Sequence, residues 1–219
     1  MIRPATWAPL LAALSLAALP GCPPVPATPT PAPLQQAFDK GDALAIADAL
    51  EALIGEKNDT GHDRQLAYDQ VKSKEEPTAA YAYARAMITG RLVQAKGLTA
   101  AFLVREMEAW AEKSRSLDPT FRSGGAARML GTLYVLAPAS LLAHGDSEKG
   151  LELLEKVVND YPDAPENHLR YAEALIALGD PEPATAPLCK ALAQKTRLQK
   201  DDQHLLQKVF QDAGSPLCP

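Results

Sequence analysis

The chain has 219 residues, of which 47% are hydrophobic and 22% charged, so most of it can bury a core instead of staying disordered. Alanine outnumbers valine, isoleucine and threonine taken together, which favours helices over a sheet. The net charge of −5, without a long basic run, argues against nucleic acid as a partner.

The first residues have the pattern of a bacterial export segment. Arg3 precedes an uncharged run over 8–19, which is shorter than the roughly 20 residues that span a bilayer core. The sequence LPGC at 19–22 then resembles the bacterial lipoprotein box, although its proline replaces the usual small residue. This resemblance implies a signal peptide over 1–21, a lipid such as palmitate on Cys22, and an anchor in an envelope membrane facing the periplasm. The alternatives are an ordinary signal peptide cut nearby, or a buried apolar helix.

A proline-rich tether follows the lipidated cysteine, so that 22–33 forms one segment. Six prolines occupy the eleven positions of 23–33. Proline fixes φ and lacks the amide donor, which excludes helix and sheet there. At about 3.1 Å per residue, a polyproline II tether would hold the folded part roughly 34 Å from the bilayer.

The remainder, 34–219, is predicted to be all-α. Its apolar residues recur at helical spacing, and most joints are short enough to make successive helices antiparallel neighbours. Asp42, Asp118 and Asp146 stand at helix starts, where their carboxylates can accept from free amides. The predicted helices are 34–39, 43–55, 63–75, 78–95, 98–117, 120–136, 147–160, 166–178, 182–194 and 200–212.

Residues 165–194 resemble the tetratricopeptide repeat. Large and small residues alternate at the repeat's helix-packing positions, which are His168, Tyr171, Ala172, Leu175, Ala184, Leu188 and Ala191. Upstream, 78–95 pairs with 98–118 and 120–136 with 147–162 in the same way. The resemblance implies an α-solenoid of stacked antiparallel helix pairs, whose first helices, 78–95, 120–136 and 166–178, line the concave face.

A narrower resemblance rests on the run SGGAARMLGTLY at 123–134, together with Ala137-Pro138, Gly145-Asp146 and Pro165-Glu166-Asn167. This pattern of small residues and joints is similar to the T-component associated with tripartite ATP-independent periplasmic (TRAP) transporters. It implies a non-catalytic lipoprotein whose partner is a periplasmic solute-binding protein. The sequence leaves two alternatives open: an envelope assembly lipoprotein for outer-membrane or pilus machinery, and a periplasmic small-ligand carrier.

No catalytic motif, metal-ligand spacing or cofactor fingerprint occurs in the sequence, so we expect neither an enzyme nor a cofactor. Aromatic and arginine side chains are common interface anchors, and leucines in a joint are available to a partner. The candidate partner-binding residues are Tyr81, Arg85, Arg128, Tyr134, Leu141, Leu142 and His144. The competing interpretations are core packing for the aromatic residues, a solvated arginine, and a joint folded back over the core.

The last predictions from the sequence concern two glycines and two cysteines. Gly124 and Gly125 fall inside a predicted helix, which indicates close approach of a neighbour, a later helix start at Ser123, or the floor of a ligand groove. With Cys22 lipidated, Cys189 and Cys218 remain in an oxidising compartment and are predicted to form a disulfide that pins the tail. The alternative is a buried Cys189 and a Cys218 in a frayed end.

Overall fold

The computed structural model describes residues 29–218, except for the side chains of residues 98 and 99. The described part contains ten α-helices, three short 3₁₀ helices and no strand. The helices are α1 Ala32–Lys40, α2 Ala43–Gly55, α3 Gly61–Lys72, α4 Ala79–Lys96, α5 Ala101–Leu117, α6 Phe121–Leu136, α7 Ser147–Asp160, α8 Pro165–Ala177, α9 Pro181–Ala193 and α10 Lys200–Asp212; the 3₁₀ helices are η1 Gly97–Ala100, η2 Ala139–Leu141 and η3 Lys195–Arg197. The predicted signal peptide and Cys22 lie outside the described residues.

The all-α prediction is confirmed, and most predicted helix ends lie within two residues of the observed ones. One difference is at the start, where α1 begins at Ala32, inside the predicted tether. Proline in a first turn loses no helical hydrogen bond, so Pro33 does not delay the helix. A second difference is α3, which ends at Lys72 instead of 75 and begins with a capping box between Thr60 and Asp63.

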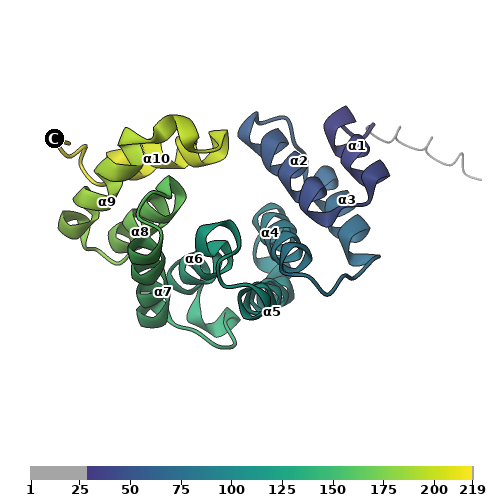
Figure 1. The fold of residues 1–219 in the computed structure, drawn as a ribbon, viewed down its shortest axis with the longest axis horizontal. Coiled ribbons are helices and arrows are strands. Elements are labelled where there is room, and N and C mark those ends of the chain that lie inside the picture. The colour runs from purple at the N-terminus through teal and green to yellow at the C-terminus, as the bar shows by residue number, and fades with distance from the viewer. Residues whose placement is uncertain (1–28, 219) are drawn as a thin grey trace, which may run out of the picture.

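The helices stack as successive antiparallel pairs, α4 with α5, α6 with α7 and α8 with α9. Figure 1 shows these pairs arranged as an arc, with α4, α6 and α8 towards its inner side. Small residues permit the close approach within a pair: a Cβ added to Gly131 of α6 would lie 2.8 Å from the carbonyl oxygen of Gly150 in α7. The fold is therefore the stacked α-solenoid that the sequence predicted.

Aspartates cap two of the three predicted helix starts. Asp42 accepts from the amides of Leu44 and Ala45, and Asp146 accepts from that of Lys149. Asp118 instead accepts from the amide and hydroxyl of Thr120, before the helix begins. Across residues 29–218, no helix has the length and apolarity to cross a membrane.

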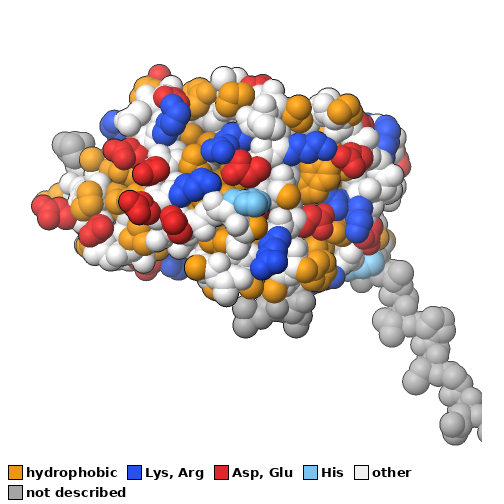
Figure 2. Space-filling view, turned by 90° about the horizontal axis from the view of Figure 1, so that it is seen from below, with side chains coloured by type: hydrophobic (Ala, Val, Ile, Leu, Met, Phe, Trp, Pro, Cys, Tyr) orange, Lys and Arg blue, Asp and Glu red, His pale blue; other side chains and the backbone are white. Residues whose placement is uncertain are grey.

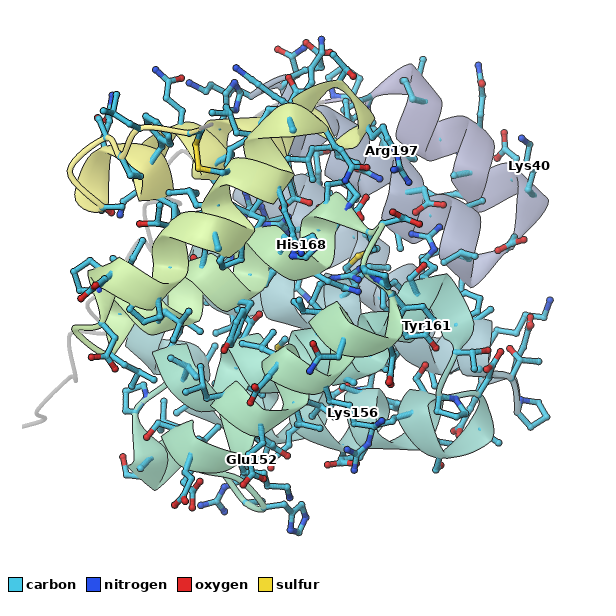
Figure 3. The ribbon with its side chains drawn as sticks, turned by 60° about the vertical axis from the view of Figure 1, so that its left-hand side comes forward. Lys40, Glu152, Lys156, Tyr161, His168 and Arg197 are labelled. Carbon is cyan, nitrogen blue, oxygen red and sulfur yellow. A yellow bond between two sulfur atoms is a disulfide. The ribbon has the colours of Figure 1, made fainter. Side chains whose placement is uncertain are left out.

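The C-terminal tail is joined to α9 by a bond between Cys189 and Cys218, whose Cα atoms lie 5.4 Å apart. Figure 3 shows this disulfide above the helices that carry the predicted repeat. His168 lies inside those helices, fully buried, while Glu152 and Lys156 lie at the outer edge. The sequence-based interpretation of His168 as a packing residue thus agrees with its position.

Candidate binding cleft

A cleft of about 830 Å³ opens on the inner side of the arc, a size typical of small-molecule sites. Helices α4 and α6 form about half of its wall, and α2, α5, α7, α8, α10 and η3 contribute the rest of its helical lining. The larger aliphatic side chains and the methionines of the lining are Met87, Val93, Val104, Met107, Met129, Leu133 and Leu136. The three predicted first helices thus meet at the cleft.

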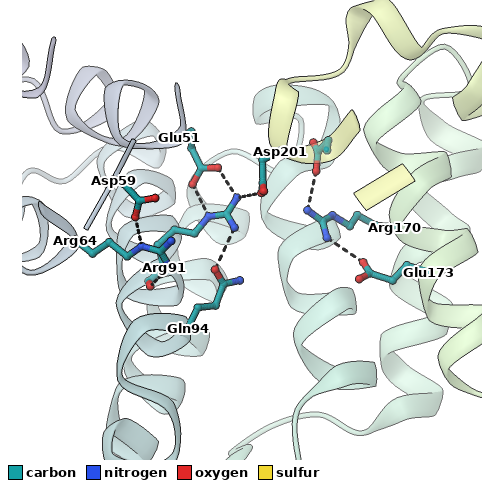
Figure 4. Close-up of polar contacts among 9 residues, drawn as sticks. Glu51, Asp59, Arg64, Arg91, Gln94, Arg170, Glu173 and Asp201 are labelled. Carbon is teal, nitrogen blue, oxygen red and sulfur yellow. Dashed lines mark hydrogen bonds and ion pairs between the residues drawn. The ribbon is translucent and has the colours of Figure 1, made fainter. Parts of the chain in front are cut away.

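Polar contacts join the two ends of the arc across the cleft (Figure 4). Arg91 of α4 donates from Nε to Glu51 of α2 at 2.7 Å, and from Nη2 to Asp201 of α10 at 2.6 Å. Gly55 allows α10 to approach α2, because a Cβ there would lie 3.0 Å from Cβ of Lys200. The arc is therefore closed on itself.

Two further arginines of the cleft are held by carboxylates. Arg170 donates to Asp202 at 2.7 Å and to Glu173 at 2.9 Å (Figure 4), and Arg122 donates to Asp48 at 2.6 Å. Burial alone would lower the pKa of each guanidinium, but the facing carboxylates raise the pKa above its ordinary value. Both guanidinium groups are therefore charged, and the facing carboxylates balance that charge.

Arg128 differs because no carboxylate of the described residues pairs with it. Its Nη1 donates to Oδ1 of Asn167 at 2.6 Å and to the carbonyl of Arg122 at 3.5 Å. Asn167 is fully buried, and its Nδ2 donates to the carbonyls of Ser123 and Val157 at 3.1 and 3.2 Å. A buried amide thus orients the guanidinium at the cleft wall.

The segment before Arg128 has an unusual backbone. Arg122, Ser123 and Gly124 have φ values of 49°, 54° and 74°, so a left-handed turn interrupts the helix predicted over 120–136. Left-handed φ costs an ordinary L-residue roughly 1–2 kcal/mol. The turn presents the carbonyls of Arg122 and Ser123 to Arg128 and Asn167, and this is its visible structural consequence.

Both glycines of this segment are close-approach positions. A Cβ on Gly124 would lie 2.8 Å from Cγ1 of Val157, and one on Gly125 would lie 2.9 Å from Cε2 of Tyr83. Gly125 also lines the cleft. The side chain of Ser123 does not cap the helix, so the interpretation that a helix starts later, with Ser123 as its cap, is wrong in that respect.

With this geometry in place, the comparison with known families is informative. The model of the tetratricopeptide repeat matches residues 141–200. Residues 141–200 form a tetratricopeptide repeat region. The match covers α7, α8 and α9 and confirms the repeat predicted at 165–194. It includes Arg170 of the cleft lining and Asn167, which holds Arg128. No curated protein matches the chain.

Three of the predicted partner-binding residues are core residues instead. Tyr81 and Arg85 are 3% exposed and Tyr134 is 1% exposed. The hydroxyl of Tyr81 donates to the carbonyl of Val71, and Arg85 pairs with Glu106. The face of α4 that Tyr81 and Arg85 share packs against α3 and α5, so the prediction that these side chains meet a partner is corrected.

Part of the loop between α6 and α7 is held by α5. The fully buried Glu108 of α5 accepts from the amides of Ala143 and His144, both at 2.8 Å. Leu142 packs on the buried cluster around α5 and α6, and Leu141 is partly buried. Leu141, Leu142 and His144 do not line the cleft, and their role in binding a partner stays a prediction.

Of the seven predicted partner-binding residues, Arg128 is the one that lines the cleft. The sequence analysis missed Arg91 and did not single out Asn167 as a site residue. Asn167 is a buried polar side chain in the first turn of a helix, within the motif Pro165-Glu166-Asn167. Arg91 had no such local signal, because both its carboxylate partners come from distant helices.

Proposed function

We propose that this chain is a non-catalytic binding protein of the bacterial envelope, anchored by a lipid on Cys22, whose concave side receives a protein partner. The observation that carries the proposal is the meeting of α4, α6 and α8 at one cleft. Repeat solenoids present their first helices to partners along such a concave surface.

The finer form of the proposal is a component associated with a TRAP transporter, with a periplasmic solute-binding protein as partner. The sequence run that supports this resemblance, 123–134, supplies part of the cleft wall. It contributes Ser123, Gly125, Arg128, Met129, Thr132 and Leu133. Half of the residues in this run therefore also line the cleft.

Anchoring has its own test. The intact mass of the detergent-extracted protein should correspond to an acylated chain that begins at Cys22. A Cys22→Ala variant should remain uncut or become soluble. A wild-type protein found free in the periplasmic extract would contradict the anchor.

Site-specific crosslinking tests the partner surface. A photo-crosslinking amino acid is placed in the full-length protein at Gln94, which is exposed and lines the cleft, or at Gln207, which is exposed on α10 outside it. Irradiation of intact cells should give adducts with an envelope protein from position 94 and none from position 207. Equal adducts from both positions, or adducts from 207 alone, would reject the concave surface.

A small-ligand carrier is the second candidate, because α10 closes the arc against α2. A cleft of about 830 Å³ inside a closed arc suits a small molecule better than an extended polypeptide. The face in Figure 2 mixes acidic, basic and hydrophobic side chains without a large area of one kind, so the cleft is the more distinctive surface.

A further inference from the structure

The arginines that line the cleft fall into two groups. Arg91, Arg122 and Arg170 each have carboxylate partners within 3 Å. Arg128 and Arg197 have none, but Arg197 is exposed to solvent and donates to Gln194. Arg128 is partly buried, and its Nε and Nη2 make no hydrogen bond to the described part of the chain. A partly buried guanidinium without a counter-ion is unfavourable, so this position offers binding energy to an anion.

The position of Arg128 is built by three neighbours. Asn167 holds Nη1, and the left-handed turn supplies the carbonyls that fix both Arg128 and Asn167. Strained backbone of this kind persists only where surrounding structure supports it, and it clusters at ligand sites. The two free donors, Nε and Nη2, form the side of a guanidinium that matches a planar carboxylate.

The other residues that line the cleft restrict the charge and polarity of a ligand that can bind. Six carboxylates and five arginines line the cleft, so its summed charge is slightly negative and disfavours a dianion. Methionine and leucine side chains provide an adaptable apolar wall for the remainder of the ligand. The closed arc favours a small free molecule over a polypeptide segment.

We propose that the cleft binds a small monocarboxylate with an apolar body, whose carboxylate pairs with Arg128. Such a ligand gives Arg128 its missing counter-ion and places its hydrocarbon against Met129 and Leu133. This inference goes beyond the proposal of a protein partner, because the acid would bind to this protein in the absence of any partner.

The test is calorimetric titration of full-length protein in lipid nanodiscs with hexanoate, with empty nanodiscs as the blank. Arg128→Gln should weaken hexanoate binding at least tenfold. The affinity of Arg128→Lys should lie between those of the wild type and Arg128→Gln, because lysine keeps the charge but loses the pair of donors that matches a carboxylate. The matched control is Arg197→Gln, which removes another arginine of the cleft and should change affinity less than twofold. The neutral analogue 1-hexanol should bind more weakly and be indifferent to Arg128. Thermal melts establish that each variant is folded.

Several outcomes would overturn the proposal. No binding of hexanoate to the wild type would do so, as would equal binding to the folded Arg128→Gln variant or an equal loss in Arg197→Gln. Inorganic phosphate binding as tightly as hexanoate would reject the preference for a monoanion. Binding of a short peptide acid without binding of hexanoate would assign Arg128 to a partner's terminus instead. Because crosslinking at position 94 reports partner binding separately, failure of either proposal is distinguishable from failure of the other.

Discussion

Helices α8 and α9 pack through aliphatic side chains and alanine, whereas α3, α4 and α5 pack around charge and aromatic rings. Leu169, Ala172 and Leu188 are fully buried in the C-terminal cluster. In the N-terminal region Arg85 lies 4.4 Å from the ring centre of Tyr68 and 6.0 Å from that of Trp110. The contrast teaches that one solenoid can rely on a regular apolar repeat at one end and add a buried cation to its apolar core at the other.

The largest expected effect is at the buried cation. Arg85→Ala removes the partner of Glu106, the cation–π contacts and a hydrogen bond to the carbonyl of Tyr68. Breaking a buried ion pair on one side costs about 4 kcal/mol of unfolding free energy. Urea unfolding followed by circular dichroism measures this cost.

A matched control lies on the neighbouring helix. Arg105 of α5 is exposed, and Arg105→Ala should change the unfolding free energy by less than about 0.5 kcal/mol. If Arg85→Ala proves as mild as Arg105→Ala, the N-terminal region does not depend on its cation and the contrast between the two ends fails.

The next effect concerns the disulfide at the C-terminal end. Replacing Cys189 and Cys218 together by serine should lower the unfolding free energy by roughly 3.5 kcal/mol in the chain-entropy model, because the bond closes a long loop. Thiol labelling of the unreduced, denatured wild type should detect neither cysteine. Labelling of both would show that they are unpaired.

The apolar packing of α9 gives a smaller loss. Leu188 is fully buried, so Leu188→Ala should cost about 3 kcal/mol through lost contacts and the cavity left behind. Leu192, on the same helix, is 37% exposed and should tolerate alanine within about 0.5 kcal/mol. Denaturant midpoints compare the two variants, and equal losses would argue against a regular apolar interface.

The smallest effect is a pH dependence at His168. Its Nε2 faces the carbonyl of Pro162 at 2.7 Å, its Nδ1 has no partner, and burial lowers its pKa from the ordinary value. As pH falls below about 6.5, the unfolded chain therefore takes up the proton first, and folding stability declines until the folded pKa is reached. The loss is about 1.4 kcal/mol for each unit of pKa shift.

Thermal melts between pH 5 and 8 test this dependence. His168→Gln should flatten the part of the stability curve below pH 6.5 and leave the slope above pH 7 nearly as in the wild type. An unchanged curve in the variant would assign the acid sensitivity to other groups.

How well the sequence predicted the packing at each end of the solenoid depends on which side chains are buried there. Leucine and alanine at repeat spacing in α8 and α9 indicate a buried face, so the pairing of these helices was predictable. Tyr81 and Arg85, four residues apart, were interpreted as candidate interface residues, because aromatic and arginine side chains are common interface anchors. Glu106, the residue that makes this burial possible, lies 21 positions further along the chain.

Composition and periodicity by themselves determined the helices and their order in antiparallel pairs, because these depend on contacts between neighbours in the chain. The repeat at 165–194 was predicted from a family resemblance. The tertiary structure decided which residues form the cleft. Arg91 is joined to Asp201 across 110 positions, and Arg128 to Asn167 across 39. Closure of the arc and an arginine without a carboxylate arise from the accumulated rotation of stacked pairs, and local sequence patterns do not encode that rotation.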